Sequence, residues 1–540
     1  MRPMRKALPA AAIVVVLSAL AGGMFGSKVA ARQDRANERY RMYLAALDAI
    51  QNDYVESLDQ QQLVYGSIDG MLRTLDPHSA FLDPRSFAQM RERQVGAYFG
   101  IGISILSIDG EITVISLFEG SPAYRSGIRR NDIIAKVGKE ETKPWGPDPR
   151  KQTEEVVRRI KGPRGTTVDI SIRRPGVDQL IDLTVERDEI HIVTVRTAFM
   201  MSPGVGYIRL QDFSETSNAE VTAALAKLKS QGMEKLILDL RDNPGGPLDQ
   251  AIAVSNQFLK KGQMIVFTKG RVTTEDEYVA VEEGAFTTQP LIVLTNRNSA
   301  SASEIVTGAM QDHDRAVVVG ETTFGKALVQ SVYSIHNNAG LALTTGRYYT
   351  PSGRLIQRPW DGAFDEYLTY GLRDQSDSKP HSPAELKYTD SGRKVYEGGG
   401  IEPDHFVAGP VEGFNPTRFS RLLQSRGAFI GFAEKFTKEG DTRAAARSAA
   451  THKVAPGWQI NDAIVDEFKQ YLANQRVRID EAAFKADLAF IKAMIHFEVD
   501  TDLFSFEEAR RNLVRVDPQA QAALSHFDEA KQLLMARKGQ

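Results

Sequence analysis

Three polar side chains in the middle of the chain include a serine and a lysine, two residue types that can act as a nucleophile and its base. Ser301 follows an apolar run and a polar turn, and it opens a segment with helical periodicity. Lys326 lies 25 residues further on, and Gln330 follows it by 4. The backbone at the start of a helix places a serine hydroxyl beside N–H groups that have no partner within the helix. Such a nucleophile needs a base, and a lysine acts as one where its surroundings depress its pKa from about 10.4.

The residues around Ser301 predict a β-α-β unit that would position it. Residues 291–294 form a short apolar run that is typical of a buried strand, and Ile305 and Met310 then recur on one side of a helix. Residues 316–319 predict a second buried strand. A strand, a helix and a strand in this order belong to an α/β layer. We therefore expect Ser301 at the turn where the first strand ends and the helix begins.

This stretch resembles the C-terminal processing peptidases, which are also called tail-specific proteases. Their signature joins S-A-S-A-S-E on a strand-to-helix turn to F-G-K-x-x-x-Q downstream, and residues 299–304 and 324–330 contain both motifs. The resemblance implies that Ser301 is the nucleophile, that Lys326 is the general base and that Gln330 orients the lysine. Ala327 departs from the family, in which glycine usually follows the lysine, but its methyl group removes no functional group.

A second family motif, Asp-Leu-Arg-Asp-Asn-Pro-Gly-Gly, occupies residues 239–246. It joins a predicted strand at 235–240 to a predicted helix at 247–259. Two glycines at such a junction allow backbone N–H groups to point outward, where acyl transfer needs donors for the developing negative charge. By resemblance, Gly245 or Gly246 forms the oxyanion hole together with the N–H of Ala302. The sequence leaves the choice between the two glycines open.

Residues 95–190 resemble a PDZ domain, because a glycine-containing turn leads into a strand and the later strands and short helix follow in the family's order. Backbone N–H groups exposed by the turn hold a peptide's terminal carboxylate in such domains, while the strand edge pairs with the peptide. The expected partners are therefore protein substrates with accessible C-terminal tails. The expected tail-binding residues are Phe99, Gly100, Ile101, Gly102 and Ile103.

The composition excludes several other classes of function. The chain has 540 residues, of which 42% are hydrophobic and 25% charged, and its formal net charge of -2 gives no indication of nucleic-acid binding. It contains no cysteine, so a disulfide framework and a thiol nucleophile are both excluded. The 9 histidines are scattered without the spacing of metal ligands, and no metal, ATP or other cofactor is expected.

The N-terminus carries an export signal, because Arg2, Arg5 and Lys6 precede an apolar run over residues 7–25. Small residues at 29–31 are compatible with a cleavage site, but the run is also nearly long enough to remain as a membrane anchor. The sequence leaves these alternatives about equally open. We expect the protein outside the cytoplasm, in a periplasm or a similar compartment, and attached to the inner membrane if the segment is retained.

These observations predict an α/β protein with five regions. By resemblance, its core is crotonase-like (of the ClpP/crotonase type), with an inserted β-rich PDZ domain, an N-terminal helical segment and a C-terminal helical extension. The helical extension carries no recognisable chemistry, so packing or homo-oligomer formation is expected of it. The regions are residues 1–32 (signal peptide or anchor), 33–94 (helical), 95–190 (PDZ domain), 191–412 (serine protease core) and 413–540 (helical).

The function that these features predict is an exported serine endopeptidase that binds protein tails and cleaves peptide bonds through an acyl-enzyme. One alternative is a non-catalytic PDZ adaptor on an inactive protease core. Another is a Ser/Lys hydrolase of the penicillin-interacting class, but that class places its lysine three residues after the serine, where this chain has Glu304.

Overall fold

The computed structural model of the chain describes residues 38–536, except 109, 144–147, 175, 273–274, 361–366, 368, 373–380, 410–415 and 438–453. The basic and apolar N-terminal segment and its expected cleavage site lie outside the described residues. Among the helices of the described ranges, none has the length and the apolar character needed to cross a membrane. The chain divides into two compact units between Asp83 and Pro84.

The first unit is mainly helical, as its apolar periodicity predicts. It contains a helix over residues 38–53, α2 (Gln60–Leu72) and the short strand β1 (Ala80–Leu82). Asp76 holds the turn after α2, since its carboxylate accepts hydrogen bonds from the backbone N–H of Ser79 at 2.7 Å and from the Ser79 hydroxyl at 2.7 Å. Short polar side chains stabilise turns in this way.

The second unit begins with α3 (Pro84–Val95) and continues into a small β domain. Ser121 caps α4 (Pro122–Arg125), a proline occupies the first helical position, and Gly127 ends the turn with φ +85°, all as the sequence predicts. The sequence did not reveal α5 (Pro149–Ile160), which packs its apolar side against the sheet. The strands of this domain are β2 (Ala97–Gly100), β3 (Ile103–Ile108), β4 (Glu111–Leu117), β5 (Ile133–Val137), β6 (Glu140–Glu141), β7 (Thr167–Arg173), β8 (Ile181–Glu186) and β9 (Asp188–His191).

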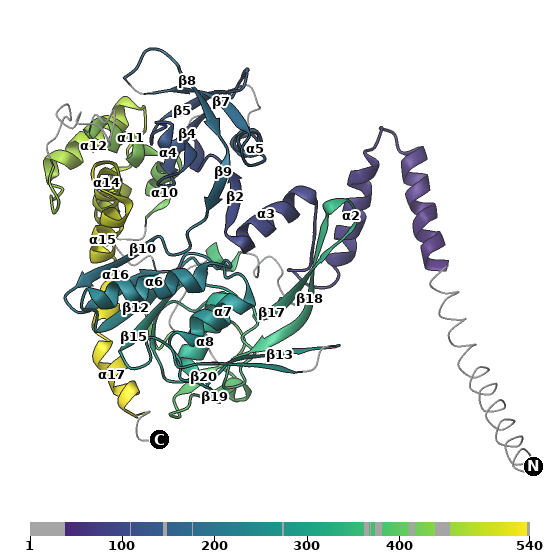
Figure 1. Cartoon of the computed structure of the whole chain (residues 1–540), viewed down its shortest axis with the longest axis vertical. Helices are drawn as coiled ribbons and strands as arrows, with labels where there is room; N and C mark the ends of the chain where they lie inside the picture. Colours follow the sequence, from purple (N-terminus) through teal and green to yellow (C-terminus); the bar gives the residue numbers. More distant parts are fainter. Residues whose placement is uncertain are drawn as a thin grey trace, which may run out of the picture. The chain divides into compact units, whose positions relative to one another are not determined.

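A six-stranded sheet forms the centre of the second unit, with the strand order β10-β11-β12-β15-β16-β21. The first two strands are antiparallel, and β11 to β21 run parallel to one another. This mixed sheet and the surrounding helices confirm the predicted α/β class (Figure 1). The strands are β10 (Thr197–Ser202), β11 (Val205–Arg209), β12 (Lys235–Asp239), β15 (Leu291–Thr295), β16 (Val317–Gly320) and β21 (His405–Phe406).

Both faces of the central sheet are apolar, because the parallel strands are continuous hydrophobic runs. Such runs are typical of parallel sheets that are covered on both sides. Leu236 and Leu238 of β12 pack into one core with α6 (Ser217–Ser230), α7 (Leu248–Asn256) and α8 (Ala302–Asp312). The alternate residues face a second core. That core contains Ile237, Ile292, Leu294, Val317 and Val319 of the sheet with Val514, Ala520 and Phe527 from the end of the chain.

The C-terminal helices α15 (Phe506–Val516), α16 (Pro518–Leu524) and α17 (Phe527–Ala536) therefore form the second cover of the central sheet. This is the packing role that the sequence predicted for the C-terminal region. The helices that precede them form a separate core rich in phenylalanine, and α14 (Leu488–Leu503) reaches the small β domain, where Arg130 forms ion pairs with Glu498 and Asp502. The helices of this core are α10 (Arg418–Ser425), α11 (Ala428–Thr437), α12 (Asp462–Asn474), α13 (Glu481–Ala486) and α14 (Leu488–Leu503).

A second sheet of the same unit contains long antiparallel strands. In it β18 (Gly340–Tyr349) pairs with both β17 (Leu328–Ser334) and β13 (Met264–Gly270), and β13 also pairs with β14 (Asp276–Val279). The polar composition of residues 371–397, which are rich in Ser, Asp, Lys and Gly, is typical of a loop. The structure instead has a hairpin there, formed by β19 (Leu386–Tyr388) and β20 (Lys394–Tyr396).

The packing of α17 on the sheet gives a stability prediction. Phe527 is 4% exposed, and Lys235 Nζ lies 4.7 Å from the centre of its ring. Phe527→Ala should lower the free energy of unfolding by roughly 3–5 kcal/mol, because it removes a buried ring and leaves a cavity. The matched control is Met535→Ala on the same helix, since Met535 is 58% exposed. Denaturant unfolding curves that give equal losses for the two variants would show that α17 does not cover the sheet in solution.

Candidate active site

Ser301 lies at the turn between β15 and α8, as the sequence predicts, and its backbone has an unusual conformation. Its φ of +53° and ψ of -113° lie in a region that residues other than glycine rarely occupy. The surrounding contacts must hold such a residue in place. The N–H of Ser301 donates to Glu304 Oε2 at 2.8 Å, and α8 begins at the next residue.

A cavity of about 480 Å³ brings the predicted site residues together. Ser301, Lys326 and Gln330 all contribute to its wall, and so do Gly245 and Gly246. Lys326 Nζ donates to Gln330 Oε1 at 3.0 Å. The register of β17 shifts between Val329 and Gln330, and a bulge of this kind changes the direction of the side chains that follow it.

The topology of the sheet explains why distant segments meet at this cavity. The strands β12, β15 and β16 are neighbours and run parallel, so their carboxyl ends lie at one edge. The glycine turn follows β12, Ser301 follows β15, and Lys326 follows β16. Ligand and catalytic sites of open α/β sheets are found at this edge.

The two glycines differ in the hydrogen bonds that their N–H groups make. The N–H of Gly245 donates to Asn243 Oδ1 at 2.9 Å. The N–H groups of Gly246 and Ala302 have no hydrogen-bond partner among the described residues. Gly245 has φ +94°, and a Cβ atom there would lie 2.7 Å from Ala302 N, so the glycine turn and the start of α8 are in close contact. Of the two glycines, Gly246 is therefore the one with a free donor.

The glycine turn of the PDZ domain also has free donors. The N–H groups of Ile101 and Gly102 have no partner among the described residues, while the carbonyl of Ile101 accepts from Ala123 N at 2.9 Å. Gly102 has φ +81°, and a Cβ atom there would lie 2.3 Å from Ser121 Cβ, so only glycine fits. The alternation of Ile101, Ile103 and Ile105 is typical of a strand that begins at Ile101, but β3 begins at Ile103. Ile101 belongs to the turn, and its side chain is buried. Gly100 ends β2, and Phe99 beside it is 46% exposed.

Comparison with known proteins gives matches to three family models. The model of peptidase family S41 matches residues 204–362, that of the PDZ domain matches residues 113–174, and that of the activating protease CtpB N-terminal domain matches residues 25–86. A carboxy-terminal-processing protease of Bartonella bacilliformis is 39% identical over 316 residues, which cover 57% of this chain and 70% of the relative. The carboxy-terminal processing protease CtpA of Bacillus subtilis is 33% identical over 383 residues, which cover 71% of this chain and 76% of the relative.

The chain belongs to the carboxy-terminal processing proteases. It is thus a serine peptidase with a PDZ domain, and the predicted family, enzyme class and fold class are confirmed. Among solved structures, the photosystem II D1 C-terminal processing protease is similar, with 28% identity, a TM-score of 0.34 and coverage of 58% of this chain and 89% of that one. The PDZ match begins after Ile103, so the tail-binding residues stay a prediction.

Glu304 connects the turn of Ser301 to the loop of Lys326, and no role for it follows from the sequence motifs. Its side chain is fully buried and accepts four hydrogen bonds. Oε2 accepts from the N–H of Ser301 at 2.8 Å and from that of Lys326 at 2.8 Å. Oε1 accepts from the N–H of Gly325 at 2.7 Å and from the hydroxyl of Thr323 at 2.5 Å. The S-x-x-E pattern of a capping box indicates the hydrogen bond from the N–H of Ser301, but not those from the loop of residues 323–326.

Tyr348 of β18 makes a second connection between the same loops. Its hydroxyl lies 3.2 Å from the carbonyl oxygen of Ser301 and 2.5 Å from that of Lys326, and it donates to these acceptors. Burial, followed by the nearby charge of Glu304, raises the pKa of Tyr348 well above its usual value, so the phenol stays protonated. No sequence pattern marked this residue, because it contacts the site through a different sheet.

One group of described residues has the chemistry of metal ligands. The ligand atoms of His405, His526 and Glu529 lie within 4.8 Å of one another, and His405 Nε2 is 2.6 Å from Glu529 Oε2. The group joins β21 to α17, and none of its members lines the cavity at Ser301. It therefore has no part in the chemistry of that cavity.

The burial of Glu304 gives a prediction about pH. Burial outweighs its hydrogen bonds and raises the pKa of Glu304 to about 7, from 4.5. A carboxyl group whose pKa is raised on folding stabilises the folded state at low pH, and this contribution is lost as the pH rises through about 7. Glu304→Gln cannot titrate. The free energy of unfolding of the wild type, relative to this variant, should thus fall by roughly 3 kcal/mol between pH 4.5 and pH 8.

Denaturant unfolding of the two proteins across this range measures the difference. A difference that stays constant with pH would mean that Glu304 remains ionised throughout.

Proposed function

We propose that the protein cleaves peptide bonds by nucleophilic catalysis, with Ser301 as the nucleophile and Lys326 as the general base. The observation that carries the proposal is the cavity at the edge of the sheet, whose wall contains both residues, Gln330 and the glycine turn. The hydrogen bond from Lys326 Nζ to Gln330 Oε1 supports an orienting role for Gln330. This hydrogen bond uses an N–H of Lys326, so the lone pair of the neutral lysine stays available for the proton of Ser301.

In this mechanism Ser301 Oγ attacks the carbonyl carbon of the substrate and transfers its proton to Lys326 Nζ. The negative charge that develops on the carbonyl oxygen is stabilised by the N–H groups of Gly246 and Ala302, which have no other partner among the described residues. Lys326 then protonates the leaving amine, and an acyl-enzyme on Ser301 remains. Water attacks the ester and gives a proton to Lys326, which passes it to Ser301 Oγ as the ester bond breaks and the carboxylic acid product leaves.

The PDZ domain provides the site for the substrate's tail in this proposal. The free N–H groups of Ile101 and Gly102 would bind the terminal carboxylate, and the edge of β3 would pair with the residues before it.

We further propose export, on the basis of the basic and apolar segment at residues 2–25. A reporter fused to the C-terminus that works in the cytoplasm alone would contradict export.

The dyad is tested by substitution and by pH. Ser301→Ala should lower kcat by several orders of magnitude and leave folding and tail binding intact. Lys326→Arg should be equally inactive because arginine stays protonated, and wild-type activity should rise with pH until the lysine is neutral. Kinetics with an unfolded protein substrate measure both effects. Suitable controls are Ser334→Ala, at an exposed site on β17, and Lys269→Arg, on β13. Ordinary turnover by either active-site variant would sink the proposed mechanism.

Tail recognition is tested with matched peptides that end in a free carboxylate or in an amide. A carboxylate that accepts hydrogen bonds from backbone N–H groups gains roughly 1.5–3 kcal/mol from each. Amidation should therefore reduce kcat/KM by at least about tenfold at low substrate concentration, since about 1.4 kcal/mol corresponds to a factor of ten. The rate at saturation should change little. Equal kcat/KM values for the two peptides would show that this PDZ domain does not bind the carboxylate.

A further inference from the structure

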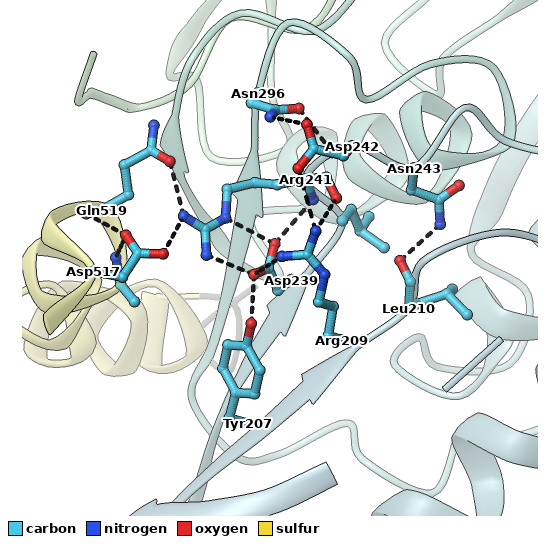
Figure 2. A network of polar contacts seen from close by, with 12 residues as sticks. Tyr207, Arg209, Leu210, Asp239, Arg241, Asp242, Asn243, Asn296, Asp517 and Gln519 are labelled. Carbon is cyan, nitrogen blue, oxygen red and sulfur yellow. Dashed lines mark hydrogen bonds and ion pairs between the residues drawn. The ribbon is translucent and has the colours of Figure 1, made fainter. Parts of the chain in front are cut away.

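Arg241 occupies the start of the glycine turn, and its side chain contacts three acceptor residues. It is 7% exposed, and four of its side-chain donor contacts are to buried or partly buried acceptors. Nε donates to Asp239 Oδ1 at 3.0 Å, and Nη2 donates to Asp239 Oδ2 at 2.7 Å. This is a bidentate pair of the strong type. Figure 2 shows Arg241 at the centre of the network.

Asp239 is the fixed counter-charge of this arginine at the end of β12. Its side chain is fully buried and also accepts a hydrogen bond from the Tyr207 hydroxyl at 2.6 Å. Burial opposes its ionisation, but Arg241 and Arg209 outweigh burial and hold the pKa of Asp239 well below its usual range. The pair is thus charged at every pH at which the enzyme would work.

The second side of Arg241 is occupied by the C-terminal region. Arg241 Nη1 donates to Asp517 Oδ2 at 2.7 Å and to Gln519 Oε1 at 2.9 Å (Figure 2). Asp517 is also the N-cap of α16, because its Oδ1 accepts from the N–H of Gln519 at 2.9 Å. Gln519 Nε2 donates to the carbonyl of Val407 at 2.8 Å, just after β21. The guanidinium is therefore held between the end of β12 and the start of α16.

The residues after Arg241 transmit this placement to the proposed oxyanion donor. Asp242 has φ +60° and forms hydrogen bonds with Asn296, through its N–H at 2.9 Å and its Oδ1 at 2.8 Å. Asn243 Nδ2 donates to the carbonyl of Leu210 at 2.9 Å. Gly246 follows three residues later. A donor to an oxyanion must be placed to within a fraction of an ångström, so the position of Arg241 constrains the donor of Gly246.

We propose that Asp517 and Gln519 are positioning residues for proteolysis. They hold Arg241 from the side that Asp239 does not occupy and so fix the turn that carries the N–H of Gly246. The C-terminal helices then act on the catalytic step as well as covering the sheet. This inference rests on the proposed function, because it assigns the turn of residues 242–246 to the oxyanion hole. Neither residue touches the substrate, so their effect appears in kcat and not in tail binding.

Two variants remove these contacts and leave the helix its cap. Asp517→Asn keeps an oxygen that accepts from the N–H of Gln519, since asparagine caps helices as well as aspartate does, but it loses the charge that faces Arg241. Gln519→Met removes both hydrogen bonds of the amide at similar volume. Asp480→Asn is the matched control, because Asp480 caps α13 by accepting from Ala483 N at 3.0 Å in an exposed site.

The readouts separate positioning from a merely structural role. We would measure kcat and KM with a fluorogenic peptide that carries a free tail, and the inhibition constant of a peptide aldehyde whose hemiacetal oxygen occupies the oxyanion hole. The dissociation constant of the uncleaved tail would be measured in the Ser301→Ala background. Since loss of one oxyanion donor costs about 10²–10³ in kcat, displacement of the donor should lower kcat about tenfold or more. Aldehyde binding should weaken by a similar factor, while the tail's dissociation constant stays within about twofold.

The outcomes distinguish the two levels of the proposal. If Ser301→Ala retains turnover, the proposed function fails. If Ser301→Ala is inactive but Asp517→Asn and Gln519→Met behave like Asp480→Asn, the positioning role alone is wrong. If the variants lower the melting temperature but leave kcat and aldehyde binding unchanged, Asp517 and Gln519 serve stability only. If one variant fails to fold, the other gives the same comparison.

Discussion

The central sheet has two apolar faces, and most of the architecture follows from the need to cover both. The runs at β12, β15 and β16 put large aliphatic side chains on alternating sides, so one layer of helices leaves half of them in water. The segments between the strands supply the first layer. The second layer comes from the last three helices of the chain, α15 to α17, because no crossover helix within the protease core reaches that side among the residues the structure describes. A region without chemistry of its own is thus part of the catalytic domain.

The same sheet fixes where chemistry is possible. Three parallel strands end side by side, so the polar loops that follow them lie close together. Hydrogen bonds between the loops then set their relative positions. Glu304 and Tyr348 connect the serine turn to the lysine loop, and the carbonyl of Asn243 connects the glycine turn to the serine turn. Removal of one of these buried partners leaves several unpaired polar groups in the interior, which is costly. The site therefore depends on contacts that no single motif contains.

Local patterns were sufficient to predict the strands and the helix around Ser301, but they missed α5 and the hairpin of β19 and β20. The buried strands, the helix after Ser301 and the spacing of Lys326 follow from periodicity and from a motif that lies within about thirty residues. The choice between Gly245 and Gly246 required the structure, because it depends on which N–H the Asn243 side chain binds. Arg241 and Gln519 are 278 positions apart, and charge alone does not indicate which of many acidic or amide residues a buried arginine contacts. Such pairings depend on the topology of the finished fold.

The position of the second helix layer in the chain has a consequence for the order of assembly. A ribosome makes the strands of the central sheet first and the helices that cover one face last. Until residues 506–536 have emerged, that face of the sheet is open, and Arg241 lacks the acceptors of Asp517 and Gln519. The loop that precedes Gly246 acquires its full set of contacts only after Asp517 and Gln519 have been made. A growing chain therefore contains every residue of the Ser301 cavity well before that cavity has its final support.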